Sequence, residues 1–257
     1  MNLILLADAE TRNFPSGTPA AEHLLRTLKI APGGTFWCGV RNGARGLATV
    51  REISPRGDVA FSVAWEKKSP AQTLPRVRLA VGLSRPQTMK KIFAVAAELG
   101  CSRIDVFRSE KSDPAYAKSS LWSDGGATLS EIFEKAAEQT CSTAFPSFAF
   151  HDSLAKFLAF DATKKNLSAE NFRVALDVYC AEKSLAEIAF PTDAEIALAV
   201  GSERGWTDAE RASLRAENFV FAHLGGRVLR VETAVGAALS VALSKTNFWR
   251  PHEILNV

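Results

Sequence analysis

Two glycine-bearing segments near the C-terminal end carry the residues best suited to chemistry. "VGSERGW" (200–206) sets a glutamate and an arginine between glycines, and "LGGRVLRVETA" (224–234) sets two arginines, a glutamate and a threonine behind a Gly-Gly pair. Glycines let the backbone approach a ligand, and exposed N–H groups beside arginines can hold an anionic or polar molecule. Together, the two segments predict a ligand-binding crevice. The alternative is ordinary glycine turns whose arginines form salt bridges to Glu203 or Glu232.

Each segment follows an apolar run typical of a strand and leads into a helical pattern. "AEIALAVG" precedes the first segment, and Thr207 and Glu210 have the spacing of a capping box that opens a helix. "FVFAHL" precedes the second, and the Ala/Val/Leu-rich stretch 234–243 follows it. If the two strands are neighbours in a parallel sheet, both segments lie at carboxyl ends and line one pocket.

Strand-like and helical runs alternate from residue 76 onward, which predicts an α/β domain with helices on both faces of a parallel sheet. The expected strands are 76–83, 102–107, 173–180, 195–201 and 219–224, and the expected helices are 85–100, 128–140 and 153–160. The polar stretch 108–126 has no assigned element.

The first 70 residues have a different pattern of apolar runs and turn residues. Short apolar runs separated by "PGG", "RNGARG" and "PRGD" predict a small β-barrel or compact sheet. Its expected strands are 2–7, 35–40, 46–53 and 58–65. One helix is expected at 19–30, where Leu24, Leu25 and Leu28 share a face. The charged, proline-flanked stretch 66–75 is the expected linker.

Composition narrows the class of protein. The chain has 257 residues, 47% hydrophobic and 23% charged, without the roughly 20-residue apolar run of a membrane helix. The four cysteines and four histidines are dispersed, which argues against metal ligands and disulfides and favours a reducing cytoplasm. Residues 1–120 hold 18 Lys/Arg against 10 Asp/Glu. This surplus weakly indicates a polyanionic partner; solvated basic faces explain it equally well.

The two glycine segments resemble those of the RsmE family of 16S ribosomal RNA uridine-N3 methyltransferases, a SPOUT-class family. The family pattern is "GPEGG" opening one helix and "LGxRILRxETA" opening another; this chain matches the second closely and has Ser202 and Arg204 in place of a proline and a glycine of the first. Weaker similarities lie at 21–34, 96–112 and 134–140. Val95 stands where the family usually has lysine, and the arginine that commonly follows the 134–140 motif is missing.

The resemblance implies a fold and its partners. It implies a SPOUT-type trefoil-knotted parallel-sheet methyltransferase domain at 74–257, preceded by a PUA-like RNA-binding β-barrel at 1–70. It further implies S-adenosyl-L-methionine as cofactor, ribosomal RNA of the small ribosomal subunit as partner, and a homodimer formed through the C-terminal knot and helix 234–243. No membrane or metal partner is expected.

The resemblance also suggests roles for individual residues. Arg230 is expected to stabilise charge on the uracil carbonyls, with Glu203, Glu232 or a water accepting the N3 proton. Glu232 is expected to orient Arg230, and Thr233 to cap the following helix. The expected cofactor-binding residues are Val200, Gly201, Glu203, Gly205, Leu224, Gly225, Val228, Leu229 and Thr233. The expected RNA-binding residues are Arg26, Lys29, Arg41, Arg45 and Arg227.

Two other functions are also compatible with the sequence. The departures at Ser202, Arg204 and Val95 are compatible with a SPOUT methyltransferase that acts on a different RNA or base. The same scaffold can also serve as a non-catalytic RNA-binding ribosome-assembly factor, although retention of both arginines in 224–234 argues against a dead site. A generic nucleotide-binding α/β enzyme lacks support, because no P-loop or GxGxxG motif is present.

Overall fold

The computed structural model describes residues 3–66, 74–163, 171–191, 194–246 and 249. The chain divides into two compact units, Met1–Leu74 with Glu134–Phe145, and Pro75–Phe133 with Pro146–Val257. The stretch 134–145, which the sequence assigned to the later domain, therefore belongs with the first unit. Most of the expected linker, 67–73, lies outside the described residues.

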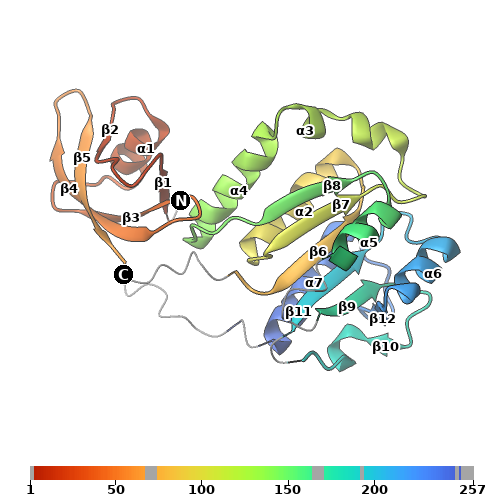
Figure 1. Ribbon diagram of the computed structural model, residues 1–257. Helices are drawn as coiled ribbons and strands as arrows, with labels where there is room; N and C mark the ends of the chain where they lie inside the picture. The colour runs from red at the N-terminus through yellow and green to blue at the C-terminus, as the bar shows by residue number, and fades with distance from the viewer. Residues whose placement is uncertain (1–2, 67–73, 164–170, 192–193, 247–248, 250–257) are drawn as a thin grey trace. The chain divides into compact units, whose positions relative to one another are not determined.

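The first unit is built on a five-stranded sheet in the order β1-β3-β4-β5-β2 (Figure 1). Its strands are β1 (Ile4–Leu6), β2 (Asn13–Phe14), β3 (Thr35–Val40), β4 (Arg45–Ile53) and β5 (Val59–Trp65). Only the β1–β3 pair is parallel. All four strands expected here are confirmed, and the two-residue β2 is additional because so short a strand leaves no periodic pattern.

A short helical segment closes the core of this unit. Thr18 caps α1 (Pro19–Glu22), and a π-helical turn, η1 (His23–Thr27), continues it. Leu24 is fully buried, whereas Leu28 is 49% exposed. Leu28 is the C-cap residue that follows the π-turn, so of the three leucines expected on one face, Leu24 is buried in the core while Leu28 stands at the exposed end. The core contains the packed rings of Phe14, Phe36 and Phe61.

The second unit is an α/β fold around a seven-stranded, wholly parallel sheet, as the sequence predicted. The sheet has the order β10-β12-β9-β11-β6-β7-β8. Its strands are β6 (Val77–Gly82), β7 (Arg103–Phe107), β8 (Ser147–His151), β9 (Asn171–Leu176), β10 (Lys183–Ser184), β11 (Glu195–Val200) and β12 (Val220–His223). The edge strands β8 and β10 were not foreseen, since they are short and only partly buried.

Helices cover both faces of this sheet (Figure 1). α2 (Pro86–Glu98) packs on α7 (Val231–Lys245) on one face, and α5 (Leu154–Thr163) and α6 (Asp208–Ala216) lie on the other. α3 (Ser120–Ser123) and α4 (Ala127–Thr140) fall between β7 and β8 in the chain. α7 buries one side, and the rest of its surface is largely half-buried. In the described part of the chain no helix is long and apolar enough to cross a membrane.

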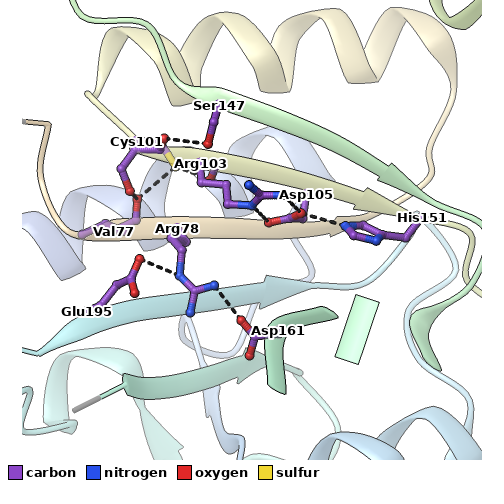
Figure 2. Close-up of polar contacts among 10 residues, drawn as sticks. Val77, Arg78, Cys101, Arg103, Asp105, Ser147, His151, Asp161 and Glu195 are labelled. Carbon is purple, nitrogen blue, oxygen red and sulfur yellow. Dashed lines mark hydrogen bonds and ion pairs between the residues drawn. The ribbon is translucent and has the colours of Figure 1, made fainter. Parts of the chain in front are cut away.

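Buried charges fasten α5 to the sheet. Arg78 of β6 and Arg173 of β9 flank Ala197 of β11 in register, and both guanidinium groups lie against the carboxylate of Asp161 on α5, at 2.6 and 2.7 Å. Figure 2 shows the Arg78–Asp161 contact beside Arg78–Glu195 and the separate Arg103–Asp105–His151 chain. Because a lone buried charge is strongly disfavoured, Arg173 depends on Asp161, whereas Arg78 shares its charge between Asp161 and Glu195.

Candidate functional site

A pocket of about 400 Å³ opens at the carboxyl ends of three strands of the second unit. Both glycine segments line it, as expected. The strands before them are nevertheless not neighbours, because β9 lies between β11 and β12. The expectation of adjacent strands is wrong, and its correction adds a third loop, Leu176–Tyr179, to the pocket wall. The strand predicted over 173–180 ends at Leu176.

The loop after β11 makes a tight turn. The N–H of Gly205 donates to the carbonyl of Ser202 at 2.8 Å, and Gly205 has φ +67°. Arg204 does not adopt positive φ, so Gly205 is the residue of this turn whose backbone conformation favours glycine. A Cβ on Gly201 would stand 3.2 Å from the Gly205 backbone, whereas one on Gly205 would meet nothing within 4 Å. The absence of a side chain at Gly201 thus lets the two ends of the turn approach each other, and the absence of one at Gly205 leaves space beside the backbone in the pocket.

Trp206 joins this loop to the loop after β9. Its side chain is 1% exposed and stacks on Phe107 with ring centroids 5.8 Å apart. The indole N–H donates to the carbonyl of Leu176 at 2.9 Å. An aromatic residue buried in the core therefore fixes the distance between two walls of the pocket.

The segment after β7 holds the same loop from another side. Ser109 Oγ donates to Ser202 Oγ at 3.0 Å, and Lys111 Nζ donates to the carbonyl of Trp206 at 2.7 Å. The carboxylate of Glu210 accepts the N–H of Glu110 at 2.9 Å as well as that of Thr207 within the capping box. The predicted capping box is confirmed, and its glutamate also anchors a segment that the sequence left unassigned.

The loop after β9 is held by a buried ion pair. Asp177 is 7% exposed, and its Oδ2 accepts from Arg211 Nε of α6 at 2.6 Å. The other oxygen, Oδ1, accepts the N–H of Tyr179 at 2.8 Å. The hydrogen bond to Asp177 raises the pKa of Arg211 above its usual value.

Most of the predicted cofactor residues line the pocket. They are Val200, Gly201, Glu203, Gly205, Leu224, Gly225, Val228 and Leu229, and Arg227 lines it with them. Thr233 is exposed on α7 and is not part of the pocket wall. The prediction that Thr233 caps this helix is wrong, because α7 begins at Val231 and Arg230 occupies the N-cap position.

The three predicted catalytic residues have different surroundings. Glu203 lines the pocket, and its Oε1 accepts from the Arg85 N–H and from Thr88 Oγ1, both at 3.2 Å, at the start of α2. Arg230 is exposed and lies between the pocket residues Leu229 and Val231 without lining the pocket itself.

The expected contact between Glu232 and Arg230 is replaced by another. Glu232 lies 3.5 Å from Lys91 of α2, so its carboxylate joins α7 to α2. Its position one residue inside α7 turns it toward the neighbouring helix rather than back toward the cap.

The basic residues proposed for RNA in the first unit differ in availability. Arg45 is paired with Glu66 at 2.8 Å, with its side chain 13% exposed, so the expectation that it contacts phosphate is not supported. Arg26 is 80% exposed beside Glu22, and Lys29 is exposed. Arg41 is also exposed and lies over the Phe145 ring at 4.5 Å. Three of the four therefore remain accessible.

The departures from the family pattern fall in different places. A Cβ on Gly236 of α7 would stand 3.3 Å from Val95, so Val95 belongs to the contact between α2 and α7. Ser202 lines the pocket but is buried and bonded to Ser109, whereas Arg204 is exposed at the pocket. Only Arg204 presents a changed, solvent-exposed chemical group to a ligand.

Several residues of the pocket wall were not predicted from the sequence. They are Lys111, Leu176, Asp177, Val178, Tyr179, Arg211, His223, Val231 and Ala234. The third loop could have been predicted from Asp177, because a charged residue after the apolar run "RVAL" indicates that a buried strand ends there and a loop begins. Within the described residues, no group of three or more His, Cys, Asp or Glu side chains is placed to hold a metal ion.

Comparison with known proteins identifies the domain. A family model described as an RNA methyltransferase domain matches residues 72–243, which include every residue of the pocket wall. The chain belongs to this family. The RNA methyltransferase domain therefore carries the three-loop pocket, and the resemblance in the two glycine segments is confirmed.

Curated relatives match nearly the whole methyltransferase chain. It is 29% identical over 231 residues to the ribosomal RNA small subunit methyltransferase E of Treponema pallidum, covering 89% of this chain and 84% of the relative. It is 27% identical over 247 residues to the ribosomal RNA small subunit methyltransferase E 1 of Borreliella burgdorferi, covering 95% and 98%.

Solved structures share the fold. One is a ribosomal RNA small subunit methyltransferase E from Neisseria gonorrhoeae bound to S-adenosyl methionine, with a TM-score of 0.71 and 23% identity over 95% of this chain and 97% of that chain. Another is a probable rRNA-methyltransferase from Porphyromonas gingivalis, with a TM-score of 0.73 and 18% identity over 97% of this chain and 100% of that chain.

Proposed function

We propose that this enzyme transfers a methyl group from S-adenosylmethionine to N3 of a uridine in 16S ribosomal RNA. The single observation that carries the proposal is the pocket formed by the loops after β9, β11 and β12 inside an RNA methyltransferase domain. The curated relatives, which are named for the small-subunit ribosomal RNA, support the choice of substrate.

The residues present fit the cofactor. The hollow falls within the size range of small-molecule sites, and its apolar wall is supplied mainly by Leu176, Val200, Leu224 and Leu229. Gly205 and Gly225 both have positive φ and leave open space where a Cβ would stand, so backbone groups can reach a ligand there. When bound, the cofactor supplies the methyl group from its sulfonium centre.

The chain's own groups act on the uracil. N3 of neutral uracil carries a proton and is a poor nucleophile, so the site must accept that proton while holding N3 in line. Glu203 is the proposed acceptor, because its carboxylate lines the pocket and is held in place by the start of α2. Arg230, an exposed cation beside the pocket wall, is proposed to stabilise charge on the uracil carbonyls.

The finer features of the fold belong to the same proposal. A trefoil knot through the C-terminal segment is supported by β12, which is inserted between β9 and β10, and by the contact of α7 with Leu185–Glu187, including a bond from Lys245 Nζ to the Ala186 carbonyl. The half-buried apolar side of α7 supports a homodimer through this helix. The five-stranded first unit is proposed to be the PUA-like RNA-binding barrel.

Two measurements test the function. We expect calorimetry to show S-adenosylmethionine binding, and nucleoside analysis of ribosomal RNA from cells lacking the protein to show loss of N3-methyluridine at one position. Loss of a methyl mark on another RNA or base would favour the alternative substrate. Failure to bind the cofactor at millimolar concentration would favour a non-catalytic assembly factor and end the proposal.

Arg230→Ala tests the proposed mechanism. Because Arg230 does not line the pocket, the variant is expected to bind the cofactor like the wild type and to lose methyl transfer. A loss of about 100-fold or more in kcat is typical when one charge-stabilising donor is removed. Wild-type turnover by the variant would remove Arg230 from the mechanism.

A further inference from the structure

Exposed apolar side chains gather at the rim of the pocket. Among the described residues, seven large hydrophobic side chains are exposed, and three of them, Val178, Tyr179 and Val228, line this one pocket. Tyr179 is the most exposed of the seven at 77%. Single exposed hydrophobic residues are normal on a protein surface, but a group of them at one pocket indicates contact with a ligand.

The backbone that carries Tyr179 is fixed, although its ring is free. Asp177 uses one carboxylate oxygen for the Tyr179 N–H and the other for Arg211, and the ion pair is almost fully buried. No aromatic ring or cation from the described part of the chain packs on the Tyr179 ring. Because the backbone is already ordered, only the two side-chain torsions of Tyr179 have to be fixed when the ring binds a ligand, which limits the entropic cost.

Cations stand at the same rim. Arg204 and Arg227 are both exposed and both line the pocket. A phosphate group next to a bound base would meet positive charge there, as single-stranded nucleic acid requires. Aromatic platforms flanked by basic residues are the usual way in which proteins hold unstacked RNA bases.

We propose that Tyr179 is the stacking platform for the RNA base that enters the pocket for methylation. The inference rests on the proposed function and adds to it a substrate-binding residue. Nucleobase faces come from two sources, the RNA and the adenine of the cofactor. The exposure of Tyr179 favours the RNA, because 77% of this residue is open to solvent, whereas Trp206 in the same pocket wall is 1% exposed.

Three variants test the stacking role by kinetics. Tyr179→Ala removes the ring and Tyr179→Phe keeps it; Val220→Ala, on an exposed part of β12 outside the pocket wall, is the matched control. With small ribosomal subunits from cells lacking this protein, Tyr179→Ala should raise KM for the subunit about 5- to 150-fold, the range for loss of one base–aromatic stack. Tyr179→Phe and Val220→Ala should keep the wild-type KM.

Cofactor affinity separates the two possible sources of the base. Calorimetry with S-adenosylmethionine should give the same Kd for Tyr179→Ala and the wild type. A Kd that rises while KM for the subunit is unchanged would place the ring on the cofactor and overturn the proposal. An unchanged KM and an unchanged Kd would overturn it as well.

A second experiment does not depend on turnover. A single-stranded oligoribonucleotide with one 5-iodouridine, irradiated with the wild-type protein, should form a cross-link at Tyr179, because this photoreaction is favoured by stacking on aromatic rings. If the wild type transfers no methyl group but cross-links at Tyr179, the proposed reaction fails and the stacking site stands. Cross-links confined to other residues would overturn the inference.

Discussion

Trp206→Phe removes the hydrogen bond that joins two walls of the pocket and leaves a small cavity where the indole was. The phenyl ring keeps the stack on Phe107 but lacks the N–H that the Leu176 carbonyl accepts at 2.9 Å. Trp206 and Leu176 are 1% and 8% exposed, so water does not readily replace the lost donor. An unsatisfied buried carbonyl costs about 1–3 kcal/mol, and we expect the free energy of unfolding to fall by at least that amount, because the lost packing of the indole adds to it.

Loss of the Trp206–Leu176 hydrogen bond should also weaken cofactor binding. Because Leu176 begins the loop after β9, releasing its carbonyl lets that loop move away from the loop after β11. The binding-competent arrangement then becomes less populated, and cofactor affinity falls by a factor of up to about 5–150, the equivalent of 1–3 kcal/mol.

A matched variant separates this effect from general weakening of the core. Phe157 stacks on Phe107 in the same cluster, is 2% exposed and does not line the pocket. Phe157→Leu should lower stability by about 1 kcal/mol through lost packing and leave cofactor affinity unchanged. Guanidinium unfolding gives the stabilities, and calorimetry at a temperature where both variants are folded gives the affinities. If Trp206→Phe binds the cofactor as tightly as Phe157→Leu, the Trp206–Leu176 bond does not shape the pocket.

Two further predictions concern the rest of the molecule. Asp161→Ala leaves buried Arg173 without its carboxylate partner and Arg78 with Glu195 alone, and should lower the free energy of unfolding by about 3–5 kcal/mol in urea titrations. Asp152→Ala, which removes an exposed ion pair with Lys156, should leave the midpoint unchanged, and equal shifts would contradict this expectation. Burial raises the pKa of Cys38 and of Cys101 to about 12, so both thiols stay protonated at neutral pH and up to strongly alkaline pH. A thiol reagent at pH 8 should label the exposed Cys180 first, and fast labelling of Cys38 or Cys101 in the native protein would show that their burial is wrong.

Local sequence determined much of the second unit. Buried parallel strands read as apolar runs, so β6, β7, β9 and β11 were found from the sequence. The Thr207–Glu210 capping box and the turn at Gly205 depend on neighbouring residues only, and both formed as predicted. The motif 224–234 indicated the family through residues that lie together in one segment.

Tertiary structure decided the order of the strands and the partners of the charges. Apolar strands of similar length are interchangeable as sequence patterns, and only their pairing within the whole sheet placed β9 between β11 and β12 and brought Tyr179 to the pocket. Ion pairs such as Arg211–Asp177 and Arg45–Glu66 join residues far apart in the chain. Their partners follow from how the elements pack, because charged groups pair with whatever opposite charge lies beside them once water is excluded.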